Sequence, residues 1–222
     1  MTDDPYVYPD TRILRNKLGI KDANELDRVE RLLARQRASE GVPAGDFDLT
    51  HLQAIHRHLF QDVYDWAGEI RTVEINKGGD QFMFRQYIGN GMADVHRRIV
   101  AADYFKGTNG AAFADETGRI IGDVNHVHPF REGNGRTQLL YLQQLSGVAG
   151  HPLVLRHIDA DAWIAASKRA NLADYTAMSR AIHAALERSA TRTKSPREVE
   201  ASGKLRDKPP KRRGGGRSGG RG

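Results

Sequence analysis

Apolar residues recur at helical spacing through most of the chain. In residues 22–37 they fall on one face of a helix that Asp22 can cap, and the same period continues over residues 48–64. Glycine and proline at positions 41, 43 and 45 interrupt the period, as expected for a connecting loop. The predicted core faces consist of Leu26, Val29, Leu32 and Leu33 in the first helix, and of Leu49, Leu52, Ile55, Leu59 and Val63 in the second.

The pattern changes beyond the second helix. Residues 70–75 approximate the alternation of a strand, residues 77–80 have the composition of a turn, and residues 81–84 can form a returning strand. A short β-hairpin is therefore predicted over residues 70–84.

Helical spacing resumes after the hairpin and continues to residue 188. The predicted helices lie at residues 89–105, 111–128, 136–150, 159–171 and 173–188, and in the third of these Leu139, Leu140, Leu142 and Leu145 are expected to be buried. The predicted fold is mainly α with one small hairpin, in a single domain that spans residues 1–188.

Basic charge is concentrated at the C-terminal end. The chain of 222 residues has a net charge of +6, but residues 189–222 alone contain 11 lysines and arginines against 3 acidic residues, so the remainder is slightly acidic. Such a segment, rich in Gly, Pro, Arg and Lys, buries little apolar surface. We predict a disordered tail over residues 189–222, with a weak, sequence-indifferent contact to nucleic acid as its sharper alternative role.

Composition excludes several classes of protein. The chain has no cysteine, which excludes disulfides, zinc–thiolate sites and cysteine nucleophiles. No stretch approaches the ~20 apolar residues that cross a bilayer, and the acidic, polar first residues do not resemble a secretory signal. We therefore expect a cytoplasmic protein without a membrane partner.

The segment HPFREGNGR, residues 128–136, has the components of a phosphate site. Gly133 and Gly135 let the backbone approach an anion, and the helix that follows points its free N–H groups at this loop. Arg136 adds a cation, Glu132 can bind a phosphate-bound Mg²⁺, and His128 can accept a proton from a hydroxyl. A simple turn with a structural histidine remains the alternative at this point.

The whole string resembles the signature of the Fic family, His-Pro-Phe-x-(Asp/Glu)-Gly-Asn-Gly-Arg-x-x-Arg. The flanking segments LFQDVYDWAGEIRTV (59–73) and VNHVHPF (124–130) are also similar to Fic sequences, and the resemblance covers about residues 10–188. It implies a Fic-type helical domain whose hairpin is a flap next to the active-site loop. It also implies an enzyme that transfers AMP from ATP to a Ser, Thr or Tyr hydroxyl of a target protein and releases pyrophosphate.

The resemblance assigns roles to individual residues. His128 is expected to be the general base, Phe130 the anchor of the loop in the core, and Glu132 the ligand of Mg²⁺ between the α- and β-phosphates of ATP. The implied nucleotide-binding residues are Lys77, Gly78, Gly133, Asn134, Gly135, Arg136, Thr137 and Gln138. The flap residues expected to pair with an extended segment of the target are Thr72, Val73, Glu74, Ile75 and Phe82.

One position departs from the signature. Its second arginine, which engages the γ-phosphate in relatives, is replaced by Leu139. The inhibitory pattern (Ser/Thr)-x-x-x-Glu-(Gly/Asn) of auto-inhibited relatives does not occur in the sequence. Any inhibitor is therefore expected to be a separate small antitoxin-like protein.

Two alternatives stay open. Fic folds also support phosphorylation and phosphocholine transfer, although Gly135 argues mildly against the kinase-like branch. A weakened or inactive Fic protein could instead act as a nucleotide- or nucleic-acid-binding module, which Leu139 and the basic tail would favour. By analogy with compact bacterial members of the family, candidate targets include subunits of type II topoisomerases.

Overall fold

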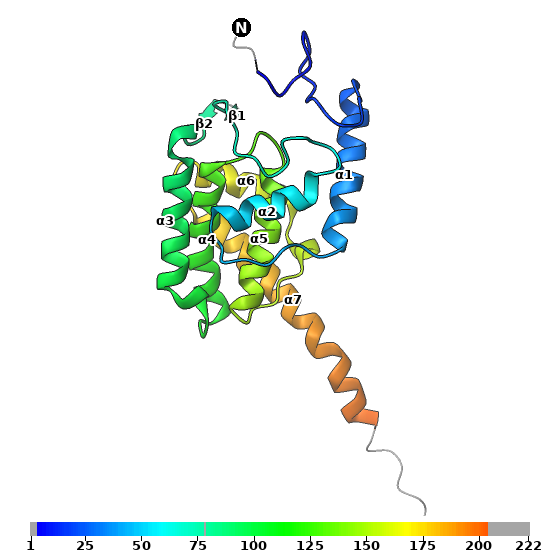
Figure 1. Cartoon of the computed structure of the whole chain (residues 1–222). Coiled ribbons are helices and arrows are strands. Elements are labelled where there is room, and N and C mark those ends of the chain that lie inside the picture. Colours follow the sequence, from blue (N-terminus) through cyan, green and yellow to red (C-terminus); the bar gives the residue numbers. More distant parts are fainter. Residues whose placement is uncertain (1–3, 78, 204–222) are drawn as a thin grey trace, which may run out of the picture.

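The computed structural model describes residues 4–77 and 79–203, of which 77, 80 and 192–203 are described by their backbone alone. Within this part of the chain lie seven α-helices (Figure 1), namely α1 (Ala23–Ser39), α2 (Leu49–Phe60), α3 (Ile88–Ala101), α4 (Gly110–Val127), α5 (Asn134–Val148), α6 (Ala160–Ala170) and α7 (Thr176–Gly203). Short 3₁₀ turns are η1 (Arg85–Tyr87), η2 (Asp103–Phe105) and η3 (Leu155–His157). None of the helices in the described ranges has the length and apolar content to cross a bilayer.

Side-chain caps determine where four of the helices begin. The side-chain oxygens of Asp22, Asp48, Asn109 and Asp159 each accept the N–H of the residue three positions on, at the starts of α1, α2, α4 and α6. Helix α5 differs, because its cap residue is Gly133 and no side chain bonds its first N–H groups. Those groups point at the loop 128–133.

Helix α4 is the centre of the bundle. Helices α3, α5, α6 and α7 all pack against it, and α2 lies between α1 and α5 (Figure 1). The close approach of α4 and α7 depends on Gly118, since a Cβ there would lie only 2.3 Å from the hydroxyl of Ser179.

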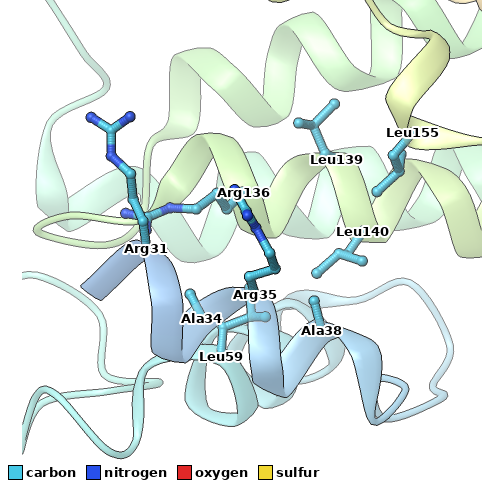
Figure 2. Close-up of a pocket in the computed structure, with 9 residues that line it drawn as sticks. All are labelled: Arg31, Ala34, Arg35, Ala38, Leu59, Arg136, Leu139, Leu140 and Leu155. Carbon is cyan, nitrogen blue, oxygen red and sulfur yellow. The ribbon is translucent and has the colours of Figure 1, made fainter. Parts of the chain in front are cut away.

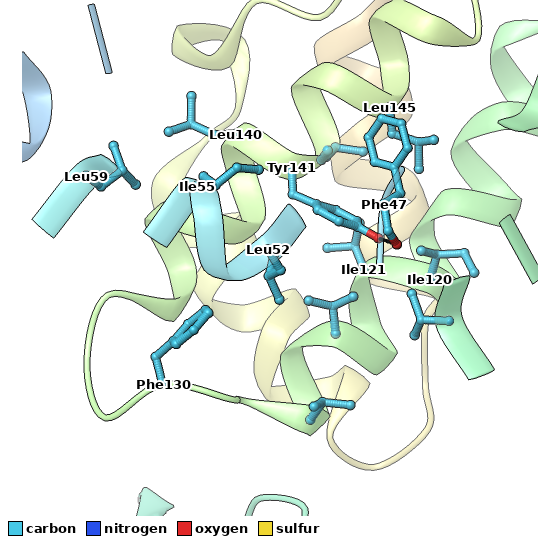
Figure 3. Packing of buried hydrophobic residues seen from close by; sticks show 14 of the residues in the cluster. Phe47, Leu52, Ile55, Leu59, Ile120, Ile121, Phe130, Leu140, Tyr141 and Leu145 are labelled. Carbon is cyan, nitrogen blue, oxygen red and sulfur yellow. Dashed lines mark hydrogen bonds between the residues drawn. The ribbon is translucent and has the colours of Figure 1, made fainter. Parts of the chain in front are cut away.

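The core is continuous with the loop that precedes α5. Phe130 is fully buried at one end of the hydrophobic cluster (Figure 3), and its ring stacks on that of His56 of α2. Farther along α5, the hydroxyl of Tyr141 donates a hydrogen bond to the Phe47 carbonyl at 2.6 Å. The predicted anchoring of the loop by Phe130 agrees with this packing.

The faces and ends of the helices differ from the sequence prediction in two places. In α1, Leu32 is 62% exposed, whereas Glu30 is buried, because this carboxylate finds partners on α5 and after α2. Helix α7 continues to Gly203, so residues 189–203 are helical where the sequence predicted disorder (Figure 1). The rest of the predicted tail, 204–222, lies outside the described residues.

The hairpin is much shorter than predicted. Only β1 (Asn76–Lys77) and β2 (Asp80–Gln81) pair, antiparallel, with Asn76 opposite Gln81. Residues 70–75 do not form a strand: the N–H of Arg71 bonds to the Pro129 carbonyl, that of Thr72 bonds to the Tyr6 hydroxyl, and the Val73 carbonyl accepts from the Arg71 side chain. The backbone N–H of Met83 likewise bonds to the His126 carbonyl at the end of α4.

Candidate active site

His128 lies where α4 ends. Its backbone is left-handed, with φ 45° and ψ 61°, which turns the chain out of the helix and into the loop. The ring nitrogen Nδ1 lies 3.1 Å from the Asn125 carbonyl oxygen, which can only accept, so Nδ1 carries a proton. Nε2 is therefore the nitrogen through which this ring can act as a base.

Phe82 supports this imidazole from the hairpin side. Its ring stacks on that of His128, with centroids 3.7 Å apart and an interplanar angle of 18°. Phe82 is buried, so its ring packs on the histidine and is not presented to solvent where a target segment could pair. The sequence placed it among the docking residues of the flap.

Asn134 closes the loop. Its amide oxygen accepts the N–H of Phe130 at 3.0 Å, and its amide nitrogen donates to the carbonyl of the same residue at 2.8 Å. The side chain is therefore committed to the loop, and an anion can be met only by backbone N–H groups at this position. Three such groups at the start of α5, from residues 134–136, precede the first helical bond from Thr137 to Gly133.

The surroundings of the two loop glycines, Gly133 and Gly135, differ in whether they leave room for a Cβ atom. Gly133 has φ +83°, and a Cβ there would lie 2.4 Å from the ring of Phe60. A Cβ on Gly135 would meet nothing within 4 Å. The protein itself therefore requires Gly133, whereas Gly135 leaves open the space through which a ligand reaches the helix N-terminus.

His56 of α2 holds the loop 128–133 from its buried side. Its Nδ1 accepts the N–H of Gly68 at 2.8 Å, and its Nε2 donates to the carbonyl of Glu132 at 2.9 Å. The ring also stacks on Phe130 at 3.9 Å. Burial lowers the pKa of His56 to about 4, with a smaller contribution from the charge of Arg136, so the ring is neutral at pH 7.

Arg71 connects the loop with the hairpin. Its fully buried guanidinium donates to the carbonyls of His128, at 2.8 Å, of Val73, at 2.6 Å, and of Met83. Its own N–H bonds to the Pro129 carbonyl at 2.9 Å. Burial lowers the pKa of Arg71, and the nearby Glu74 carboxylate opposes that effect.

The sequence did not single out His56 or Arg71. Both are polar residues in segments with an apolar or alternating pattern, and their partners lie 76 and 57 residues away. A histidine on the core face of a predicted helix was the only available signal for the first. For Arg71 the pattern predicted only a position in the strand of residues 70–75.

Glu132 and Arg136 lie at the open side of the loop. The Glu132 side chain is 49% exposed, and its Oε1 accepts the N–H of Gly133 at 2.9 Å. Arg136 pairs with Glu30 of α1, lies 3.8 Å from Glu132, and covers the ring of Phe60 at 4.7 Å. Contact of Arg136 with a polyphosphate stays a prediction.

Glu30 has a second partner in Tyr64. The hydroxyl of Tyr64 donates to the carboxylate, and burial together with the charge of Glu30 raises the pKa of this phenol. The network Tyr64–Glu30–Arg136 therefore attaches α1 to the first turn of α5.

The described part of the structure does not place four other predicted nucleotide-binding residues at the surface of the site. Thr137 and Gln138 are fully buried, so their side chains do not line the surface of the site in this structure. Both side chains lie on the buried face of α5. Gly78 and the side chain of Lys77 lie outside the described residues, and their contact with a nucleotide stays a prediction.

The remaining flap residues surround Arg71. The N–H of Thr72 bonds to the hydroxyl of Tyr6 at 3.0 Å, which fastens the N-terminal segment to the base of the flap. Glu74 accepts the N–H of Arg85 at 3.1 Å, and Ile75 accepts that of Phe82 at 3.2 Å. Docking of a target along residues 72–75 stays a prediction.

The donor set at the loop fits one kind of metal. Mg²⁺ is commonly held by one or two carboxylates together with substrate phosphates, and Glu132 supplies one such carboxylate. Among the described residues no group of three or more His, Cys, Asp or Glu side chains could hold a metal by itself. Any Mg²⁺ here therefore needs the phosphates of a nucleotide.

Known proteins share this fold and sequence. Residues 46–146 match the model of the Fic/DOC family. The probable protein adenylyltransferase y4lH of Sinorhizobium fredii is 43% identical over 152 residues, which are 68% of this chain and 79% of that protein. The probable protein adenylyltransferase Fic of Escherichia coli is 33% identical over 177 residues, 79% of this chain and 88% of the relative.

A solved structure agrees with these relatives. The crystal structure of the Bartonella tribocorum effector BepC, with bound AMPPNP, superposes with a TM-score of 0.74 at 24% identity, over 81% of this chain and 95% of that one. The helical architecture, the loop before α5 and the sequence relatives together define a Fic domain. The chain belongs to the Fic/DOC family.

Proposed function

We propose that this protein transfers AMP from ATP to a Ser, Thr or Tyr hydroxyl of a target protein. The observation that carries the proposal is the juxtaposition of two groups at the loop. His128 lies at the end of α4 with its Nδ1 held by the Asn125 carbonyl, and a few residues on, α5 begins with uncapped N–H groups. The names of the curated relatives support the same activity.

The reaction follows from these groups. Nε2 of His128 accepts the proton of the target hydroxyl, and the oxygen attacks the α-phosphorus of ATP. The bond from that phosphorus to the bridging oxygen breaks, and pyrophosphate leaves. The N–H groups at the start of α5 and the positive end of its dipole stabilise the charge on the phosphates.

A bound Mg²⁺, held by Glu132, would neutralise further phosphate charge. The same fold in BepC holds the ATP analogue AMPPNP, which is consistent with an adenine nucleotide in this groove. The target hydroxyl is brought to Nε2 by an extended segment that adds to the edge of the β1–β2 hairpin and residues 72–75.

The test uses ATP labelled at the α-phosphate, added to a bacterial lysate with the purified protein. We expect protein-bound label with the wild type, none with His128→Ala, and undiminished label with His183→Ala, a control in which a half-exposed histidine of α7 is removed. ATP labelled at the γ-phosphate should give no protein-bound label. Candidate targets to examine first are the subunits of type II topoisomerases.

Two other results of the labelling experiment would contradict the proposed reaction. Label retained by His128→Ala would contradict the role of this base, and transfer from the γ-position would indicate phosphorylation instead. A second candidate function is nucleotide binding without transfer, which Leu139, in place of the second arginine of the Fic signature, favours. Binding of ATP with no incorporation in any lysate would support that function.

A further inference from the structure

A cavity of about 320 Å³ opens beside the candidate active site (Figure 2). It lies between α1, α5 and η3, and three guanidinium side chains line it, from Arg31 and Arg35 of α1 and from Arg136 of α5. The rest of the lining is apolar and includes Leu139 and Leu155. An apolar cavity lined by three cations favours an anionic occupant.

The three arginines differ in their partners. Arg31 is paired with Asp27 at 2.8 Å, and Arg136 with Glu30. Arg35 forms no hydrogen bond or ion pair with any residue of the described part of the chain. Figure 2 shows its side chain extending from α1 toward α5. Arg35 is thus a cation aimed into the cavity without a carboxylate to neutralise it.

The cavity continues the anion-binding end of α5. Arg136 belongs to the first turn of that helix and also lines the cavity, and Leu139 lies about one turn farther along the same face. A polyphosphate bound to the N–H groups of residues 134–136 would therefore extend past Arg136 toward Leu139. Leucine offers no charge or donor there, and Arg35 approaches this place from the opposite wall.

Small residues and ion pairs set the position of α1. Ala34 and Ala38 line the cavity on either side of Arg35, and their small side chains leave the space between α1 and α5 open. Glu30 holds the helix to Arg136, and Arg37 holds it to Asp62 at 2.6 Å. Arg35 lies between these two fixed points, five residues after one and two before the other.

We propose that Arg35 binds the terminal phosphate of a nucleoside triphosphate whose inner phosphates lie at the start of α5. It takes the place of a charged residue at position 139. The inference rests on the proposed function, because it needs a triphosphate in the groove. It adds that α1, which lies outside the motif loop, selects for the third phosphate.

The test compares ATP and ADP binding, each with Mg²⁺, to the full chain by calorimetry. Arg35→Ala is expected to weaken ATP binding about tenfold, the effect of a lost charge-assisted contact, and to leave ADP binding unchanged. Arg28→Ala is the matched control, since Arg28 is an exposed arginine of the same helix that does not line the cavity. It should alter neither affinity.

A second variant guards against a general loss of structure. In Arg35→Ala combined with Leu139→Arg, the cation returns from the α5 side, and the preference for ATP over ADP should recover. The inference is overturned if Arg35→Ala weakens both nucleotides equally or neither, or if the folded double variant fails to recover the preference. Failure of the wild type to bind either nucleotide would instead overturn the proposed function, and this inference with it.

Discussion

Glu30 and Arg136 form an ion pair that joins two helices 106 residues apart in the sequence. Its carboxylate is buried on α1, and its guanidinium is on the first turn of α5, where the sequence motif predicts a contact with polyphosphate. In this structure the arginine therefore faces a carboxylate of the same chain. A phosphate must compete with Glu30 or share the guanidinium with it.

Glu30→Gln tests this competition. The amide keeps the size of the side chain and removes its charge, so ATP should bind several-fold more tightly, while the free energy of unfolding should fall by about 1–3 kcal/mol as the buried network weakens. Calorimetric ATP binding and urea unfolding measure the two effects. Glu25→Gln, at an exposed position of the same helix, is the control. Unchanged ATP affinity would show that phosphate and Glu30 do not compete for Arg136.

The two loop glycines should respond in opposite ways to alanine. Gly133→Ala places a methyl group against Phe60 at a positive φ, and should destabilise the protein by about 2–4 kcal/mol. Gly135→Ala meets open space and should leave stability unchanged or raise it by up to about 1 kcal/mol. It should nevertheless weaken ATP binding, because the methyl group occupies the approach to the helix N-terminus. Equal effects of the two changes on stability would contradict this assignment.

The buried His56 makes stability depend on pH. Its pKa is about 4 in the folded chain against 6.5 in the unfolded chain, because burial disfavours the charged ring. Between these values only the unfolded state binds the proton, so the free energy of unfolding should fall as the pH drops from about 6.5 to about 4, by about 3 kcal/mol at most. Urea unfolding at several pH values measures the slope.

His56→Gln provides the comparison for that slope. The variant should be less stable at pH 7, since it loses the stacking on Phe130, but its stability should vary less between pH 6.5 and 4. His183→Gln, at a half-exposed side chain of α7, should keep the wild-type slope. If His56→Gln also kept it, another group would be responsible.

The boundary of the folded domain lies beyond residue 188. Ser189 is buried, and its hydroxyl accepts the N–H of Val154 at 3.1 Å and donates to the Ala185 carbonyl at 2.7 Å. A chain that ends at residue 188 should lose about 1–2 kcal/mol of stability relative to one that ends at residue 191. The latter should melt close to the full chain, and should lose any salt-sensitive retention on DNA that residues 192–222 confer. Identical melting of the two truncated chains would contradict the role of Ser189.

The sequence predicts the helices and the motif loop well for a physical reason. Apolar spacing and a cap such as Asp22 are local signals, and Asp22 does cap the start of α1 in the structure. The string at 128–136 gathers base, carboxylate, glycines and cation within nine consecutive residues, so no long-range contact has to be known to recognise it.

The supporting residues are not predictable in this way. Glu30, His56 and Arg71 are charged or polar, and each is buried because its partner arrives from a distant segment. Leu32 was expected in the core because the helical period alone does not tell which of two neighbouring leucines, Leu32 or Leu33, faces the rest of the domain. The same limit applies to the hairpin, where Arg71 occupies the carbonyls that a longer ladder would use.

The hydrogen bonds of the Arg71 guanidinium have a consequence for how the protein could discriminate between targets. A single rigid guanidinium holds the carbonyl of His128 and those of Val73 and Met83 on either side of the hairpin. A displacement of the hairpin is therefore passed to the backbone of the base. An ill-fitting target that pushes the hairpin aside would still bind, but it would meet a misaligned imidazole. Discrimination between targets would then appear in the turnover number more than in the affinity, and kcat and KM measured for matched target peptides would separate the two.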